Sequence, residues 1–245
     1  MKVSSDDNLF EHYNMLNDSH KDFRNLNLFH LIATYVRGKE VVDIGCGSAY
    51  FANILATKGK NVVGIEPNSD MRALAAQINP KVTVIPGNAE EIGTLLKEPV
   101  DTIVMIDVLE HVEKDNDQVR KVRTMLKNNG EFIFVVPAYQ LLYGKRDAQM
   151  GHYRRYSKKA LHKILAAHGF HVKHMRYWNA LGVLPYVLSE KILQRPLESR
   201  LRGNAQVGIL GRMIQRGLQF WFSRVENNFD FGFGLSIIGV AKTRL

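Results

Sequence analysis

Apolar residues in the middle of the chain fall into five short continuous runs separated by amphipathic stretches. Such runs are typical of parallel strands buried on both faces, and the stretches between them are typical of crossover helices. The runs span residues 41–45, 61–67, 82–87, 101–107 and 131–138. Helices are expected over 51–58, 70–78 and 116–127, the last followed by Gly130 as a left-handed terminator. The pattern predicts an α/β fold with a doubly wound sheet.

The character of the chain changes after residue 138. Residues 138–178 contain nine Lys or Arg and one acid, Asp147. Here we expect a helix over 157–170, ending at Gly169, and a sixth strand over 171–179. A seventh strand is expected over 235–243. The intervening insertion carries apolar helical patterns interrupted by arginines.

One domain accounts for the whole length, because 245 residues that are 45% hydrophobic suffice for one substantial core. We divide it into an N-terminal helical lid (1–37), a core (38–179), a helical insertion (180–235) and the last strand (236–245). Helices over 10–36 are expected to cover a ligand, with Phe23 or Arg24 touching it.

The formal charge of +9 favours anionic partners, such as a nucleic acid, a phospholipid surface or an acidic small molecule. The single Cys46 excludes an internal disulfide. The first residues lack the apolar block of a secretion signal, and no apolar run approaches the roughly 18 residues of a membrane span. We therefore expect a cytoplasmic protein, and peripheral association with the inner membrane surface stays open.

The stretch VVDIGCGSAY, residues 41–50, places an acid and two glycines at the end of a buried strand. A strand that enters a glycine turn and then a helix brings backbone N–H groups and the positive helix end close to a ligand. The dinucleotide fingerprint G-x-G-x-x-G fails here, because its third glycine would fall at Tyr50. Glu66 ends the next strand, where an acid can accept both hydroxyls of a ribose. Together these features predict a nucleoside ligand with little or no phosphate.

Five segments then follow one another in the order and spacing of a known family. They are VVDIGCGSA, GIEPN, GNAEEI, DTIVMIDVLEHV and LKNNGEFIFVVPA. With these motifs the chain resembles the class I S-adenosylmethionine-dependent methyltransferases over about residues 38–178 and the last strand. The resemblance implies a seven-stranded sheet, with six parallel strands and an antiparallel last strand, and S-adenosylmethionine at the carboxyl ends of strands one to four.

The resemblance also implies which residues bind the cofactor. The methionine part would lie against the glycine turn, Glu66 would hold the ribose, Pro67 would pack beside the adenine, and the next loops would hold the adenine edge and close the site. The implied residues are Asp43, Gly45, Cys46, Gly47, Glu66, Pro67, Asn88, Ala89, Glu90, Asp107 and Val108. The sequence departs from the family pattern at Ala49, where a third glycine is usual, and at Asn88, where an aspartate is usual. Cys46 is interpreted as turn packing, since no activating base adjoins it.

Candidate catalytic residues follow the fifth strand, in KRDAQMGHYRRYS, residues 145–157. A hydroxyl acceptor needs a base. The hypothesis is that His152 faces the transferred methyl group, that Asp147 orients His152, and that Tyr156 or Arg155 fixes the acceptor. The alternative is an exposed basic loop in which His152 is a structural hydrogen-bonding residue. His111 and Glu113 lack an established metal spacing, so no metal site is expected.

The acceptor is the most open question. The favoured function is transfer of a methyl group to a small or amphiphilic metabolite, lipid-linked or sugar-containing, with O-methylation preferred. Nucleic acid is expected to be an unlikely partner, although HYRRYSKK leaves an RNA methyltransferase as an alternative. A non-catalytic S-adenosylmethionine-binding protein is a third reading. The 180–235 insertion can cover an amphiphilic substrate, lie on an anionic membrane, or form a homodimer face.

Overall fold

A computed structural model describes residues 22–193 and 208–244 of the chain. Its centre is a seven-stranded sheet in the order β3-β2-β1-β4-β5-β7-β6, in which β7 runs antiparallel to both neighbours and the other pairings are parallel. The strands are β1 (Glu40–Ile44), β2 (Asn61–Glu66), β3 (Thr83–Pro86), β4 (Val100–Ile106), β5 (Leu126–Pro137), β6 (Phe170–Trp178) and β7 (Ser236–Thr243). The predicted fold class is confirmed.

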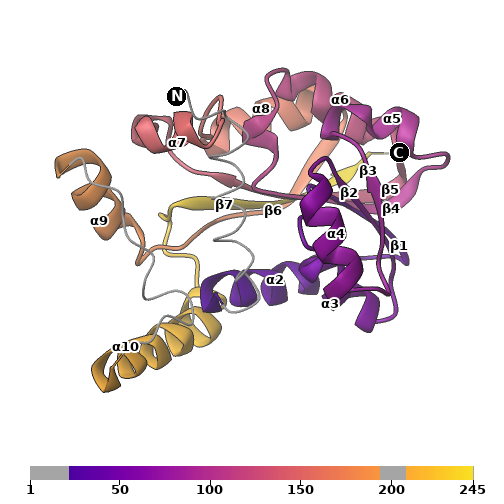
Figure 1. The fold of residues 1–245 in the computed structure, drawn as a ribbon. Helices are drawn as coiled ribbons and strands as arrows, with labels where there is room; N and C mark the ends of the chain where they lie inside the picture. The colour runs from indigo at the N-terminus through magenta and orange to yellow at the C-terminus, as the bar shows by residue number, and fades with distance from the viewer. Residues whose placement is uncertain (1–21, 194–207, 245) are drawn as a thin grey trace, which may run out of the picture.

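Helices surround this sheet, as Figure 1 shows. The helices up to the fifth strand are α2 (Phe23–Tyr35), α3 (Tyr50–Thr57), α4 (Ser69–Ile78), the 3₁₀ turn η1 (Ala89–Glu91), α5 (Ile92–Leu95), the 3₁₀ turn η2 (Leu109–His111) and α6 (Asp115–Thr124). Those after it are the 3₁₀ turn η3 (Gln140–Leu142), α7 (Lys145–Gln149), α8 (Lys158–Ala167), α9 (Val183–Tyr186), α10 (Ile209–Phe220) and two π-helical segments, η4 (Val187–Ile192) and η5 (Trp221–Glu226).

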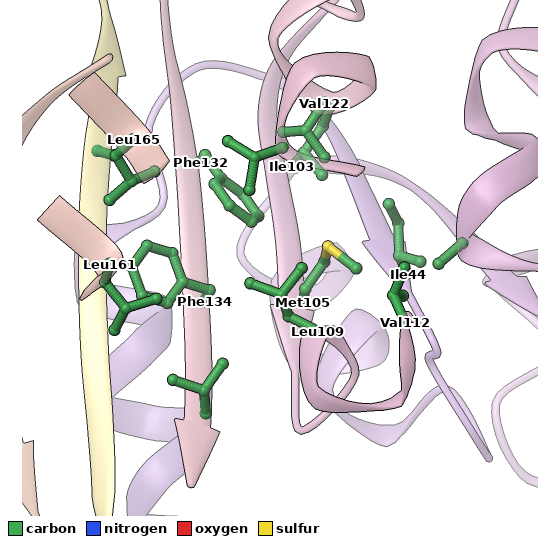
Figure 2. Close-up of a cluster of buried hydrophobic side chains, with 14 of the residues drawn as sticks. Ile44, Ile103, Met105, Leu109, Val112, Val122, Phe132, Phe134, Leu161 and Leu165 are labelled. Carbon is green, nitrogen blue, oxygen red and sulfur yellow. The ribbon is translucent and has the colours of Figure 1, made fainter. Parts of the chain in front are cut away.

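Alternate residues of the central strands pack into two separate cores, one on each face of the sheet. In β4, Ile103 and Met105 face α6 and α8 (Figure 2), whereas Val104 faces α2 and α3. Val122 of α6 is fully buried on the first face and Ile32 of α2 on the second. The continuous apolar runs of the sequence therefore reflect strands that are covered on both sides.

The boundary between α6 and β5 differs from the prediction. The helix ends at Thr124, and β5 begins at Leu126, so Gly130 lies inside the strand and terminates no helix. Buried Leu126 pairs with Val100, which draws the chain into the sheet directly after the helix. The left-handed residue is Asn129, with φ 65°, a conformation that asparagine tolerates better than most side chains.

The predicted N-terminal lid is described only in part. Helix α2 lies within the expected 10–36 range, and residues before 22 lie outside the described part of the chain. Asp22 caps α2 by accepting a hydrogen bond from the Arg24 backbone N–H at 2.8 Å. Among the described residues, no helix is long and apolar enough to cross a bilayer.

Candidate functional site

The turn after β1 is shaped by residues with positive φ. Gly45 has φ 70° and Gly47 has φ 54°, and Ala49 adopts the left-handed conformation directly before α3. The N–H of Gly45 donates to the Ile65 carbonyl at 2.8 Å, which ties the turn to the neighbouring strand. A Cβ atom on Gly45 would lie 2.5 Å from Cγ2 of Val108. Glycine is therefore required here both by the backbone and by the close approach of the β4 loop.

Glu66 joins the glycine turn to the end of β2. Its Oε2 accepts from the Gly47 N–H at 2.8 Å, and its Oε1 accepts from the Asn68 N–H at 2.9 Å. Burial raises the pKa of the Glu66 carboxyl, and the two backbone hydrogen bonds oppose that rise. Each oxygen keeps a second lone pair, so the carboxylate can still accept hydroxyl donors from a ligand.

Asp43 is a second buried carboxyl, and it lies in β1 two residues before Gly45. Burial, reinforced by the charge of Glu66, raises the pKa of Asp43 to about 8. The adjacent Cys46 packs against Gly64, where an added Cβ would lie 2.5 Å from the Cys46 sulfur. Burial and the two carboxylates raise the pKa of the Cys46 thiol, which agrees with its interpretation as turn packing and not as a nucleophile.

These groups line a cavity of about 580 Å³ at the carboxyl ends of the parallel strands. Every cofactor-binding residue implied by the resemblance lines it, namely Asp43, Gly45, Cys46, Gly47, Glu66, Pro67, Asn88, Ala89, Glu90, Asp107 and Val108. Of the two α2 alternatives, Arg24 lines the cavity, whereas Phe23 is buried in the core against Phe222. The sequence thus placed the cofactor residues around one space.

The loop after β3 is fixed from behind by α6. Gln118 donates to the Ala89 carbonyl at 2.8 Å, and Lys121 donates to the Glu90 carbonyl at 2.8 Å. The N–H of Asn88 donates to Oε2 of Glu91 at 2.7 Å. These bonds hold the 88–90 segment at the rim of the cavity in a set conformation.

His152 and Asp147 line the same cavity and contact each other. Nδ1 of His152 lies 3.0 Å from Oδ1 of Asp147, and both side chains are buried. The same Oδ1 accepts from Nε of Arg155 at 2.8 Å. Burial alone would raise the pKa of Asp147, but the hydrogen bonds from His152 and Arg155 hold it below its usual value. Asp147 therefore stays charged and fixes the ring of His152, with Nε2 free of this bond.

Tyr156 does not line the cavity with His152 and Asp147. Its side chain is buried outside the cavity lining, and its hydroxyl donates to Oδ2 of Asp115 at 3.0 Å, with the Leu109 carbonyl 3.2 Å away. Burial, reinforced by Asp115, raises the pKa of this hydroxyl. The geometry gives Tyr156 a role in holding the 152–156 segment onto η2, so we do not retain it as an acceptor-binding residue.

Tyr186 and Glu110 are among the cavity residues that the sequence reasoning missed. Tyr186 of α9 accepts from Arg155 at 2.6 Å and closes the network around Asp147. Glu110 is 1% exposed, and neither of its carboxylate oxygens has a hydrogen-bond partner among the described residues. Burial and the charge of Asp107 raise the pKa of Glu110 well above its usual value. Nothing in the local sequence marks either residue, because Arg155, which bonds Tyr186, and His152, which lies 4.0 Å from Glu110, are about thirty or more positions away in the chain.

Three potential metal ligands meet beside the cavity. Ligand atoms of Glu110, His111 and His152 lie within 4.8 Å of one another, and Oε1 of Glu110 lies 4.0 Å from Nε2 of His152. The third member stands about forty positions after the first two, outside any local motif. The group is close enough to share a cation.

Comparison with known proteins places this site in context. Residues 20–175 match the model of a family described as a methyltransferase domain. A ubiquinone biosynthesis O-methyltransferase from Photobacterium profundum is 31% identical over 101 residues, which cover 40% of this chain and 43% of that protein. A probable S-adenosylmethionine-dependent methyltransferase from Mycolicibacterium smegmatis is 26% identical over 148 residues, covering 60% of this chain and 57% of that protein. The chain thus spans about half or less of the length of these curated relatives.

Solved structures share the fold. A possible histamine N-methyltransferase from Thermotoga maritima superposes with a TM-score of 0.61 at 16% identity, covering 96% of this chain and 95% of that one. A SAM-dependent methyltransferase from Archaeoglobus fulgidus gives a TM-score of 0.55 at 19% identity, covering 88% and 94%. These likenesses concern the fold, and they leave the acceptor open.

Proposed function

We propose that this chain, which belongs to the methyltransferase-domain family, transfers a methyl group from S-adenosylmethionine to a hydroxyl oxygen of a small or amphiphilic acceptor. One observation carries the proposal. A single cavity is lined both by Asp43 and Glu66 beside the glycine turn and by the buried His152–Asp147 pair. The family and the SAM-dependent structural neighbours indicate S-adenosylmethionine as the cofactor.

The donors and acceptors in the cavity fit this cofactor. Nε of Arg24 is a buried donor with no hydrogen-bond partner among the described residues, and it suits the carboxylate of the methionine part. Asp43 suits its ammonium group, and Glu66 suits the ribose hydroxyls. Bound S-adenosylmethionine supplies a sulfonium methyl group that is open to in-line displacement.

His152 is the proposed base for the acceptor. Its Nδ1–H donates to Asp147, so the neutral ring presents the lone pair of Nε2 to the cavity. Nε2 takes the hydroxyl proton, and the charged Asp147 stabilises the imidazolium that forms. Arg155 donates one hydrogen bond to Asp147 and another to the Tyr186 hydroxyl, so Arg155 and Tyr186 together keep Asp147 in place. The chain's contribution is therefore alignment in a confined space together with proton removal.

The RNA alternative loses its main support. This alternative was based on the basic and aromatic run HYRRYSKK, but Arg155 of that run is buried against Asp147. Arg154 is also engaged, in an ion pair with Asp115 at 2.9 Å and a hydrogen bond to the Glu113 carbonyl. Arginines held in this way are poorly placed to contact phosphates. The buried His152–Asp147 pair in the cavity favours an enzyme over a protein that only binds the cofactor.

A transfer assay tests the proposal. Purified full-length chain is incubated with methyl-labelled S-adenosylmethionine and a panel of phenols and catechols carrying no tail, short tails or polyprenyl tails. We expect labelled ether product with at least one acceptor, and His152→Gln should lower kcat by about 10²–10⁴-fold while leaving cofactor affinity unchanged. His162→Gln is the matched control, because this histidine is exposed on α8. Equal turnover of the His152 variant and the control would remove the proposed base.

A further inference from the structure

The insertion exposes large apolar side chains on two helical arms. Figure 1 shows α9 and α10 extending from one side of the molecule, away from α4 and α5. We call the exposed apolar residues of this region the arm surface. They are Leu184, Leu188, Ile192 and Leu193 on the first arm, Met213, Ile214 and Phe220 on the second, and Phe229, Phe231 and Phe233 in the loop that follows. Leu184 is 77% exposed and Met213 is 65% exposed, which is costly unless something covers them.

The base of the second arm is firmly held. The buried carboxylate of Glu226 accepts from the Ala180 N–H at 3.0 Å and from Nε1 of Trp221 at 2.9 Å. Arg176 of β6 donates to the Asn227 carbonyl at 3.1 Å and also bonds the carbonyls of Glu226 and Phe229. The apolar residues beyond this base therefore point outward from a fixed support.

The charge beside the arm surface is positive. Arg212 and Arg216 are exposed on α10, one helical turn apart, and flank the face that carries Met213 and Phe220. Arg224 is exposed on η5. Among the described residues 208–226, the only acid is Glu226, which is buried at the base. The two acids on the rest of the arm surface are paired, Asp230 with Lys158 at 3.6 Å and Glu190 with Arg146 at 3.4 Å. An apolar face bordered by arginines complements an anionic lipid surface, because the side chains can enter the interface while the guanidinium groups meet the headgroups.

The first arm continues into the wall of the cavity. Tyr186 of α9 lines the cavity and bonds Arg155, while Leu184 and Leu188, two positions to either side, are exposed. At the next turn, Lys191 donates to the Tyr143 carbonyl at 2.6 Å. The same helix thus borders the catalytic end of the cavity and the arm surface. A molecule with a polar head and an apolar tail can contact both.

We propose that the arm surface docks on an anionic lipid bilayer and that the acceptor is an amphiphile whose head enters the cavity from that bilayer. The second clause rests on the proposed function, since it names the acceptor class of the same site. The docking itself does not depend on catalysis. Hydrophobic insertion of the arms supplies part of the affinity, and the arginines make it depend on anionic headgroups and on salt.

Vesicle co-sedimentation of the full-length chain, without cofactor, tests the docking. We expect the protein to pellet with vesicles containing phosphatidylglycerol, much less with pure phosphatidylcholine, and less as salt rises. The double variant Met213→Ser/Phe220→Ser should lower the partition coefficient by at least about tenfold. Arg212→Gln/Arg216→Gln should lower it by about fivefold for each charge, and only for the anionic vesicles. Ile78→Ser is the control, because Ile78 is 42% exposed on the distant α4.

Two results would overturn the proposal. One is equal pelleting of the wild type, the two double variants and the control. The other is a dimer in light scattering that the Met213→Ser/Phe220→Ser variant abolishes, with no binding to vesicles, which would make the arm surface a contact between copies of this chain. Turnover of a tail-free acceptor in solution separates this proposal from the proposed function. If docking fails while this turnover persists, only the membrane assignment falls.

Discussion

Asp43 and Glu66 place two buried carboxyl groups at the ends of neighbouring strands, beside a turn that only glycine can form. The sequence predicted both, because the position of an acid at a strand end follows from the strand pattern alone. It could not reveal Glu110 or Tyr186, whose importance arises from contacts with His152 and Arg155, distant in the chain. Local sequence thus predicts groups that secondary structure brings together, and it misses those that only tertiary packing joins.

The raised pKa of Asp43 gives the first prediction, for cofactor binding. With a pKa of about 8 in the folded protein, Asp43 is mostly protonated near pH 6.5 and must lose its proton to pair with an ammonium group. Affinity for S-adenosylmethionine should therefore rise as the pH rises toward 8, by up to about tenfold per pH unit. Calorimetry at several pH values measures this, with Asp43→Asn as the variant that should bind weakly at every pH. A wild-type affinity that is flat over this range contradicts the role of Asp43.

The raised pKa of Asp43 affects stability in the opposite direction to cofactor affinity: the free energy of unfolding falls as the pH rises. The carboxyl ionises near its ordinary value in the unfolded chain and only near 8 in the folded protein, so the folded state retains a proton between these values. The contribution of Asp43 to the free energy of unfolding therefore falls as the pH rises through this window. Urea unfolding of Asp43→Asn should lack this part of the pH dependence. The same slope in the variant and the wild type would show that Asp43 titrates normally.

The contact between Cys46 and Gly64 gives a second prediction. A Cβ at Gly64 would lie 2.5 Å from the Cys46 sulfur, inside a closely packed sheet. Gly64→Ala should destabilise the fold by about 1–3 kcal/mol through overpacking, and adding Cys46→Ala should restore part of the loss. Urea unfolding of the two single variants and the double variant measures this coupling. Strictly additive effects would mean that the sulfur is not what limits position 64.

At the level of elements, the positions of the central strands and of the helices between them follow from the apolar runs of the sequence. The misplaced end of α6 shows where this reasoning fails. Polar residues 127–130 look like a helix terminator in isolation, but the pairing of Leu126 with Val100 makes them the first part of β5. Strand pairing is a long-range interaction, so it overrides the local signal of Gly130.

A stability measurement can test how the base of the insertion is held by Glu226. Glu226→Ala would leave the buried Ala180 N–H and the partly buried Nε1 of Trp221 without their acceptor. The expected loss is about 1–3 kcal/mol for each donor that stays unpaired. Thermal and urea unfolding measure it, with the exposed Glu98→Ala as control. A variant as stable as this control would mean that the insertion is not held through Glu226.

At the level of the whole molecule, one sheet edge gathers the glycine turn, the His152–Asp147 pair and the base of the insertion. The sequence predicts this gathering because parallel strands share their carboxyl edge. It does not predict the acceptor, because the far part of the cavity is shaped by α7, α9 and the loop before β7. These segments carry no regular pattern that fixes their mutual positions.

Removal of metal ions distinguishes two roles for His152. If Nε2 of His152 is the base, its lone pair must be free, so dialysis against a chelator should leave turnover of the acceptor unchanged. The competing arrangement is a cation shared by Glu110, His111 and His152. Loss of turnover on chelation, with recovery on adding back one divalent ion, would favour that arrangement and assign His152 as a ligand.

The central claim is that the space between the glycine turn and Glu66 binds S-adenosylmethionine. Calorimetric titration of the folded full-length chain tests it most directly. We predict saturable heat with S-adenosylmethionine, at least about tenfold weaker binding for Glu66→Gln, and no binding of a nicotinamide dinucleotide. Absence of heat with S-adenosylmethionine, together with saturable binding of the dinucleotide, would contradict the account.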